Sequence, residues 1–170
     1  YGPTKLPAMV GAGPSCSQPD VGRGGERTDR REVGAASDTC TASSPDMTLT
    51  VTVDGARLHV EEDGQGEPLL LVHGLGSSAR DWFAQVPHFA SRYRVLTLDL
   101  RGHGRSDKPR EAYSISQFAR DVAVLLRKRD AWPAHVVGLS MGGMVALQLA
   151  LNAPALVRSL TIVNSASDVR

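Results

Sequence analysis

The sequence has few of the features that would point to a metal, a membrane or nucleic acid. Both cysteines, Cys16 and Cys40, precede Met47, so the stretch from Met47 to Arg170 has neither a cysteine nucleophile nor a thiolate metal site. No apolar run approaches the ~20 residues that a membrane span needs. The 19 Lys and Arg nearly balance the 18 Asp and Glu, which leaves a formal net charge of +1. We therefore expect a soluble, cytoplasmic protein that binds neither membranes nor nucleic acid.

Residues 1–46 differ in composition from the rest of the chain. They hold 7 of the 17 glycines and 5 of the 10 prolines, with few large aliphatic side chains. A segment of this kind cannot bury enough apolar surface to offset the entropy lost on ordering it. We expect residues 1–46 to be a disordered N-terminal extension and residues 47–170 to hold the folded unit.

From Met47 onward the hydrophobic pattern becomes regular. An alternating run, the turn Asp54-Gly55 and a second alternating run predict a β-hairpin. The patterns predict strands over 48–53, 57–61, 69–72, 94–100, 134–137 and 157–163, and helices over 81–91, 116–129 and 141–152. A hairpin followed by alternating strands and helices indicates an α/β fold, with a mostly parallel sheet covered by helices on both faces. Ligands of such folds bind beyond the carboxyl ends of the strands.

Four aromatic side chains fall on the predicted helices. Packing between helix and sheet is the role we expect for Trp82, Phe83, Phe89 and Phe118. Pro87 interrupts the helical pattern of residues 81–91.

One motif sits between a predicted strand and a predicted helix. Gly138-Leu139-Ser140-Met141-Gly142 matches G-x-S-x-G. A tight turn there would hold Ser140 in a strained conformation with its Oγ projecting from the sheet, and glycine at both flanks would let neighbouring backbone approach closely. The start of the helix would direct N–H groups and a positive dipole end at a developing negative charge. The pattern therefore predicts a nucleophilic serine.

Two further glycine-rich stretches also follow strands. His73-Gly74-Leu75-Gly76 comes after the buried strand 69–72, and the stretch 99–107 comes after the next strand. The second stretch contains neither G-x-x-x-x-G-K nor G-x-G-x-x-G, so a phosphate-binding loop is excluded there. We expect the stretch 99–107 to be a structural loop with turn glycines and ion pairs.

These three motifs, in this order and each after a strand, resemble the α/β-hydrolase superfamily. Among its members the chain is most similar to bacterial 3-oxoadipate enol-lactonase-like esterases and related C–C hydrolases. The resemblance extends from Met47 to about Val169 and corresponds to the first six of the family's eight sheet strands. It implies an α/β-hydrolase fold that is truncated after about the sixth strand, with residues 47–170 forming the N-terminal part of the domain.

The resemblance also implies roles for individual residues. Ser140 is the nucleophile, and the backbone N–H groups of Leu75 and Met141 form the oxyanion hole. The motif positions that support this site are His73, Gly74, Gly138 and Gly142. The family needs no metal and no organic cofactor. Its branches with an aspartate nucleophile, the haloalkane dehalogenases and most epoxide hydrolases, are disfavoured because position 140 is serine.

The catalytic base that the family requires is missing from this chain. Family members place the acid and then the histidine after the nucleophile, but no histidine follows Ser140. The five histidines all precede it, and none lies at the family's late position: His59, His73, His88, His103 and His135.

The acid also lacks a clear candidate. Some relatives place it after the sixth strand, where this chain has Asp168, and the alternative interpretation of Asp168 is an exposed loop carboxylate. With no base, we expect the chain to be an incomplete fragment that is inactive alone.

The resemblance favours hydrolysis of a small ester or lactone through an acyl-enzyme, with a small molecule as partner. Other reactions of the same fold remain open: C–C bond hydrolysis, thioester hydrolysis, acyl transfer and cofactor-free haloperoxidase-like perhydrolysis. These reactions are not separated here, because cap and pocket residues of the family lie mostly downstream. A catalytically inactive binding protein on a hydrolase fold is an alternative of another class. Nothing in the sequence indicates an oligomeric state.

Overall fold

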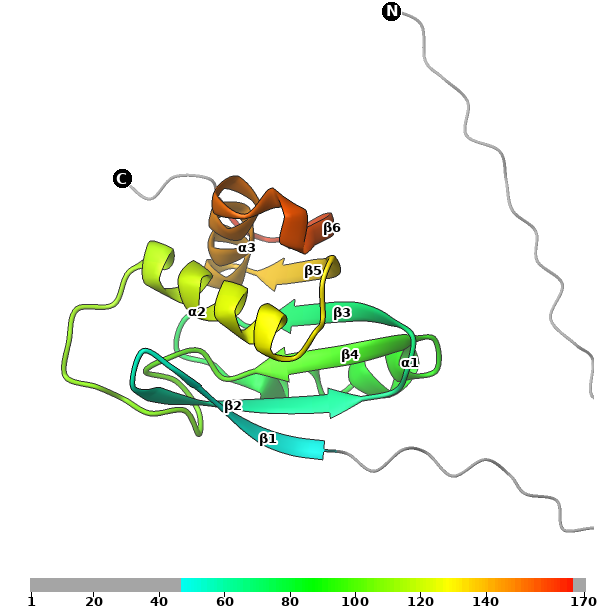
Figure 1. Cartoon of the computed structure of the whole chain (residues 1–170), viewed down its shortest axis with the longest axis horizontal. Helices are drawn as coiled ribbons and strands as arrows, with labels where there is room; N and C mark the ends of the chain where they lie inside the picture. The colour runs from blue at the N-terminus through cyan, green and yellow to red at the C-terminus, as the bar shows by residue number, and fades with distance from the viewer. Residues whose placement is uncertain (1–46, 167–170) are drawn as a thin grey trace, which may run out of the picture. The chain divides into compact units, whose positions relative to one another are not determined.

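The computed structural model describes residues 47–166 (Figure 1). The expected disordered extension, residues 1–46, and the candidate acid Asp168 lie outside these residues.

Six strands form one sheet in the order β1-β2-β4-β3-β5-β6. Their bounds are β1 (Met47–Val53), β2 (Ala56–Asp63), β3 (Glu67–Val72), β4 (Tyr93–Leu98), β5 (Ala134–Leu139) and β6 (Val157–Val163). Strand β2 pairs antiparallel with β1 and with β4, whereas β4, β3, β5 and β6 all run parallel. The predicted hairpin and the predicted mostly parallel sheet are confirmed.

Helices cover both faces of this sheet (Figure 1). Helices α2 (Ile115–Lys128) and α3 (Met141–Asn152) pack on one face over the larger core, while the short helices η1 (Ala79–Trp82) and α1 (Val86–Ala90) pack on the other. A further short helix, η2 (Pro154–Leu156), leads into β6. Within residues 47–166, none of the helices combines the length and apolarity needed to cross a membrane.

Helix α2 follows directly from its sequence pattern. Ser114 precedes it in an extended conformation and accepts a hydrogen bond from the Gln117 N–H (3.2 Å), which satisfies one backbone donor of the first turn. Arg127 and Lys128 lie at its C-terminal end, where the helix dipole favours cations. Each large side chain on its buried face contributes about 1.5–3 kcal/mol through burial. These side chains are Phe118, Val122, Leu125 and Leu126.

The helix predicted over residues 81–91 is confirmed only in part. The structure has η1 and α1 there, with a break between them. Pro87 lies in the first turn of α1, where its missing N–H costs no hydrogen bond, so it helps to begin a helix instead of interrupting one. Phe83 falls in the break and is 79% exposed, so the expectation that it packs on the sheet is wrong. Trp82 and Phe89 do pack there.

A buried ion pair fastens the loop after β4 to α2. The Arg101 guanidinium donates two hydrogen bonds to the Asp121 carboxylate, both 2.9 Å, and a third to the Val53 carbonyl (3.1 Å). The Arg101 and Asp121 side chains are 3% and 1% exposed. The Asp121 carboxylate raises the pKa of Arg101 above its ordinary value. The guanidinium also donates to the Glu111 carboxylate (3.1 Å), which is 40% exposed, so Asp121 is its buried partner and Glu111 its exposed one. The pair of Arg101 and Asp121 thus joins three segments.

Strand β6 lies at the edge of the sheet. Among the described residues it pairs only with β5, and Ile162 and Val163 are 37% and 39% exposed. An edge with unpaired backbone groups and exposed apolar side chains is a template for strand pairing between molecules.

We expect the 170-residue chain to self-associate through this edge. Thr161→Lys places a charge on exposed β6 and should shift the protein toward the monomer, because a charge on an edge strand opposes pairing. Size-exclusion chromatography with light scattering at several concentrations measures this. Asn152→Lys, at an exposed position of α3, adds the same charge away from the edge and should have no effect. A wild-type chain that stays monomeric at all concentrations contradicts the prediction.

Removal of one partner of the buried ion pair should be costly. Asp121→Ala leaves the buried Arg101 charge with only the exposed Glu111 carboxylate as partner, and we expect the free energy of unfolding to fall by up to about 3–5 kcal/mol. Urea unfolding followed by circular dichroism measures the loss. Arg120→Ala, on the exposed side of the same helix, should change stability by less than about 0.5 kcal/mol. Equal effects of the two substitutions would rule out a special role for the pair.

Candidate functional site

Ser140 is the single residue between the end of β5 and the start of α3. Its backbone has φ 51° and ψ −116°, a conformation that is strained for any residue with a side chain. The residue is exposed, and its Oγ forms no hydrogen bond with residues 47–166. The structure therefore presents an unengaged hydroxyl on a sharp turn at the carboxyl end of a central strand.

The flanking glycines allow this turn because backbone segments touch there. A Cβ on Gly138 would lie 2.3 Å from the Gly142 carbonyl oxygen. A Cβ on Gly142 would lie 2.3 Å from the carbonyl oxygen of Val72, at the end of β3. Both distances are far below a van der Waals contact. A side chain at position 138 would therefore force the turn open, and one at position 142 would push the turn away from β3.

Strand β6 and the residues after it brace the turn from the other side. The Ser140 N–H donates to the Val163 carbonyl (2.9 Å), and the Ser165 hydroxyl donates to the Ser140 carbonyl (2.6 Å). A Cβ on Gly143 would lie 2.6 Å from the Ser165 Cβ, so Gly143 makes room for Ser165. No local pattern in the sequence marks Ser165, because its contact with Ser140 spans 25 residues.

The predicted oxyanion loop lies beside Ser140. A Cβ on Gly74 would be 3.5 Å from the Ser140 Cβ, which places His73-Gly74-Leu75-Gly76 in contact with the turn. The backbone N–H groups of Leu75 and Met141 donate to no backbone carbonyl outside the regular elements of residues 47–166. The Leu75 side chain is 76% exposed. The described residues predicted to form the site thus lie together in the structure. Neither of the two predicted N–H donors is engaged by a backbone carbonyl outside the regular elements of the described residues.

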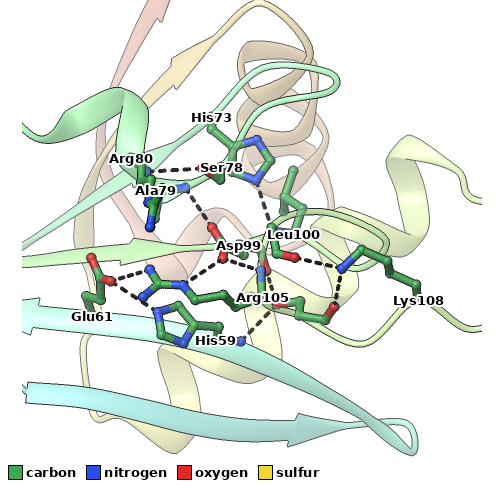
Figure 2. Close-up of polar contacts among 12 residues, drawn as sticks. His59, Glu61, His73, Ser78, Ala79, Arg80, Asp99, Leu100, Arg105 and Lys108 are labelled. Atoms are coloured by element: carbon green, nitrogen blue, oxygen red, sulfur yellow. Dashed lines mark hydrogen bonds and ion pairs between the residues drawn. The ribbon is translucent and has the colours of Figure 1, made fainter.

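The His73 side chain is a buried connector between this loop and β4. Its Nδ1 lies 2.7 Å from the Gly74 carbonyl oxygen, and its Nε2 accepts a hydrogen bond from the Leu100 N–H (3.0 Å; Figure 2). This pattern requires the neutral ring with the proton on Nδ1. Burial lowers the pKa of His73 below its ordinary value, in agreement with the neutral form.

Asp99 holds the far end of the same loop. One carboxylate oxygen accepts a hydrogen bond from the Ala79 N–H and the other accepts one from the Arg105 N–H, both 2.7 Å (Figure 2). Burial acts to raise the pKa of Asp99, but these two N–H donors, with the charge of Arg105, hold that pKa below its ordinary value. Asp99 is therefore an ionised anchor. The stretch 99–107 is a loop with turn glycines and ion pairs, as predicted.

No described histidine forms a hydrogen bond with the Ser140 hydroxyl. His59 bonds to Glu61 (3.1 Å) and the His103 Nδ1 to the Arg101 carbonyl (3.0 Å). His135 lies near the other end of β5. The part of the chain that the structure describes therefore contains the predicted nucleophile and oxyanion loop without a base on that nucleophile. In the same part, no three His, Cys, Asp or Glu side chains are arranged to hold a metal ion.

Comparisons with known proteins agree with this geometry. The family model for the alpha/beta hydrolase fold matches residues 67–169. RutD of Azorhizobium caulinodans is 43% identical over 109 residues, which are 64% of this chain and 41% of that protein. The pimeloyl-[acyl-carrier protein] methyl ester esterase of Aeromonas hydrophila is 44% identical over 107 residues, 62% of this chain and 41% of that one.

A solved structure is also similar to this chain. Est816, described as an N-acyl homoserine lactone degrading enzyme, has a TM-score of 0.67 and 38% identity over 69% of this chain and 45% of its own. The chain thus spans less than half the length of each of these relatives. The family model matches well over half of the chain and includes the loop after β3, the loop after β4 and the turn at Ser140. The chain belongs to the alpha/beta hydrolase fold family.

Proposed function

We propose that this protein hydrolyses a small ester or lactone with Ser140 as nucleophile. The observation that carries the proposal is the exposed, strained Ser140 at the junction of β5 and α3, in contact with the loop that follows β3. The names of two relatives, a methyl ester esterase and an enzyme that degrades an acyl lactone, support this substrate class.

The geometry suggests the following mechanism. The Ser140 Oγ attacks the carbonyl carbon, and negative charge develops on the carbonyl oxygen. The backbone N–H groups of Leu75 and Met141 donate to that oxygen, and one such donor contributes about 2.7–4 kcal/mol to the transition state. Met141 is also the first residue of α3, so the positive end of the helix dipole adds to the effect. Water then releases the acyl group from Ser140.

In this proposal the chain is part of a longer polypeptide. The base and the acid are residues of that polypeptide that lie outside residues 47–166. The chain spans 41% of the relatives' length at two of the matches, which supports its interpretation as an N-terminal portion. Asp168 is the candidate acid within this sequence. His73 cannot replace the missing base, because both of its ring nitrogens are already engaged and burial keeps the ring neutral.

A fluorophosphonate probe tests the role of Ser140. In the protein extended through its C-terminal half, the probe should label Ser140 stoichiometrically, and Ser140→Ala should abolish the label on the peptide that contains position 140. In the 170-residue chain, Ser140 should react at least about 100-fold more slowly, because a general base contributes about 10²–10⁴-fold. Ser91→Ala, at an exposed serine in the α1–β4 segment, is the control. An extended, folded protein whose Ser140 is not labelled would refute the proposal.

The neutral state of His73 can be tested by titration. We expect its nitrogen-15 NMR shifts to report the Nδ1–H form well below pH 6.5, its ordinary pKa. As the pH falls through that value, the unfolded chain takes up a proton that the folded chain does not. This group should therefore lower the free energy of unfolding by at most about 1.4 kcal/mol per pH unit below pH ~6.5. A folded chain with His73 doubly protonated at pH 7 would contradict the assignment.

A further inference from the structure

The hydroxyl of a second serine, unlike that of Ser140, is hydrogen-bonded to a histidine side chain. The other ring nitrogen of that histidine contacts a carboxylate. The Ser159 Oγ lies 2.7 Å from the His135 Nδ1, and the His135 Nε2 lies 3.2 Å from a carboxylate oxygen of Glu67. Within residues 47–166, this is the one serine that is hydrogen-bonded to a histidine side chain. The three residues sit near the amino ends of β6, β5 and β3, which are neighbours in the sheet, whereas Ser140 follows the carboxyl end of β5.

An irregularity in strand pairing brings Ser159 to His135. The register pairs Ala134 with Val157 but His135 with Ser159, so Arg158 is an extra residue on β6. Regular pairing would have placed Arg158 opposite His135. The bulge instead aligns the Ser159 hydroxyl with the imidazole, and the Arg158 guanidinium lies 3.6 Å from the Glu67 carboxylate. Bulges commonly re-aim side chains in this way.

The hydrogen bonds define the chemistry of the group. When the His135 Nε2 carries the proton, it donates to Glu67, and the Nδ1 accepts the hydroxyl proton of Ser159. This is the arrangement of a nucleophile, a base and an orienting acid. The Tyr93 ring packs edge-on against the imidazole with 5.8 Å between centroids, which helps to hold the ring in place. The charged groups that face His135 are Glu67 and, beyond it, Arg158.

The group is open to small molecules. Ser159 is exposed, and the His135 and Arg158 side chains are 26% and 44% exposed. Arg158 precedes Ser159 in the chain and lies 3.6 Å from the Glu67 carboxylate, so the group holds one cation beside its one carboxylate.

We propose that Ser159 is a second reactive serine, acylated or phosphonylated by small activated donors such as aryl esters, independently of Ser140. The Ser159 Oγ bonds to the donor's carbonyl carbon, and its proton passes to the His135 Nδ1. The bond to the aryloxide leaving group then breaks, and the aryloxide takes the proton from His135. Glu67 stabilises the imidazolium in between. The product is the acylated serine and a phenol.

Peptide mapping after reaction with 4-nitrophenyl acetate tests the proposal on the 170-residue chain. Trypsin cleaves after Arg80, Arg92, Arg129 and Arg158, so Ser91, Ser140 and Ser159 fall on three different peptides. Ser91 is the internal reference, because it is exposed and donates to a backbone carbonyl (2.8 Å) instead of a histidine. We expect Ser159 to be acetylated at least about tenfold faster than Ser91, as activation by a positioned base predicts.

Variants then show whether Ser159 reacts because His135 and Glu67 activate it or only because its hydroxyl is exposed. His135→Gln should lower the acetylation of Ser159 to the rate of Ser91, Glu67→Gln should lower it partly, and Ser140→Ala should leave it unchanged. Circular dichroism and urea unfolding of each variant confirm that it is folded. Equal acetylation of Ser159 and Ser91, or a Ser159 rate unaffected by His135→Gln and by Glu67→Gln in folded variants, overturns the proposal. Ser140 and Ser159 fall on different peptides, so the two results are independent. The peptide 159–170 also contains Ser165 and Ser167, so fragment-ion spectra assign the acetyl group to Ser159.

Discussion

The direct contact between the backbone of Gly142 and the carbonyl of Val72 is the constraint on which the site depends. It places the first turn of α3 against the end of β3, so the chain has one residue, Ser140, in which to leave β5 and begin a helix. The strained conformation of that residue costs about 1–3 kcal/mol. Burial of the α3 face against the larger core offsets this cost, through side chains such as Val145 and Leu149.

Buried hydrogen bonds hold the loop beside Ser140 in place. His73 ties its beginning to the Leu100 N–H, and Asp99 ties its end to the Ala79 N–H. Leu100 and Asp99 both directly follow β4, so the oxyanion loop and the loop 99–107 form one hydrogen-bonded unit (Figure 2). A donor group held in this way needs little rearrangement when charge develops on a substrate, which is the condition for electrostatic stabilisation.

Local patterns in the sequence predicted much of this arrangement. Alternation, apolar runs and turn glycines identified all six strands and the helices α2 and α3, because each depends on nearby residues. The sequence pattern does not predict the break at Phe83, because a proline within a helical pattern indicates an interruption, whereas Pro87 helps to begin α1. Neither Ser165 on the Ser140 turn nor Ser159 on His135 could be predicted. Each contact requires the exact strand register, and for Ser159 also the bulge at Arg158, which arises from packing of whole strands.

The backbone N–H of Leu100 can report on the motion of the oxyanion loop. Its proton is held by the Nε2 of His73, a side chain at the root of the oxyanion loop, so it exchanges with solvent only when that ring moves away. Movement of the ring also breaks its contact with the Gly74 carbonyl, next to Ser140. The exchange rate of this one backbone hydrogen therefore reports how often the loop departs from its preorganised state, in the absence of substrate.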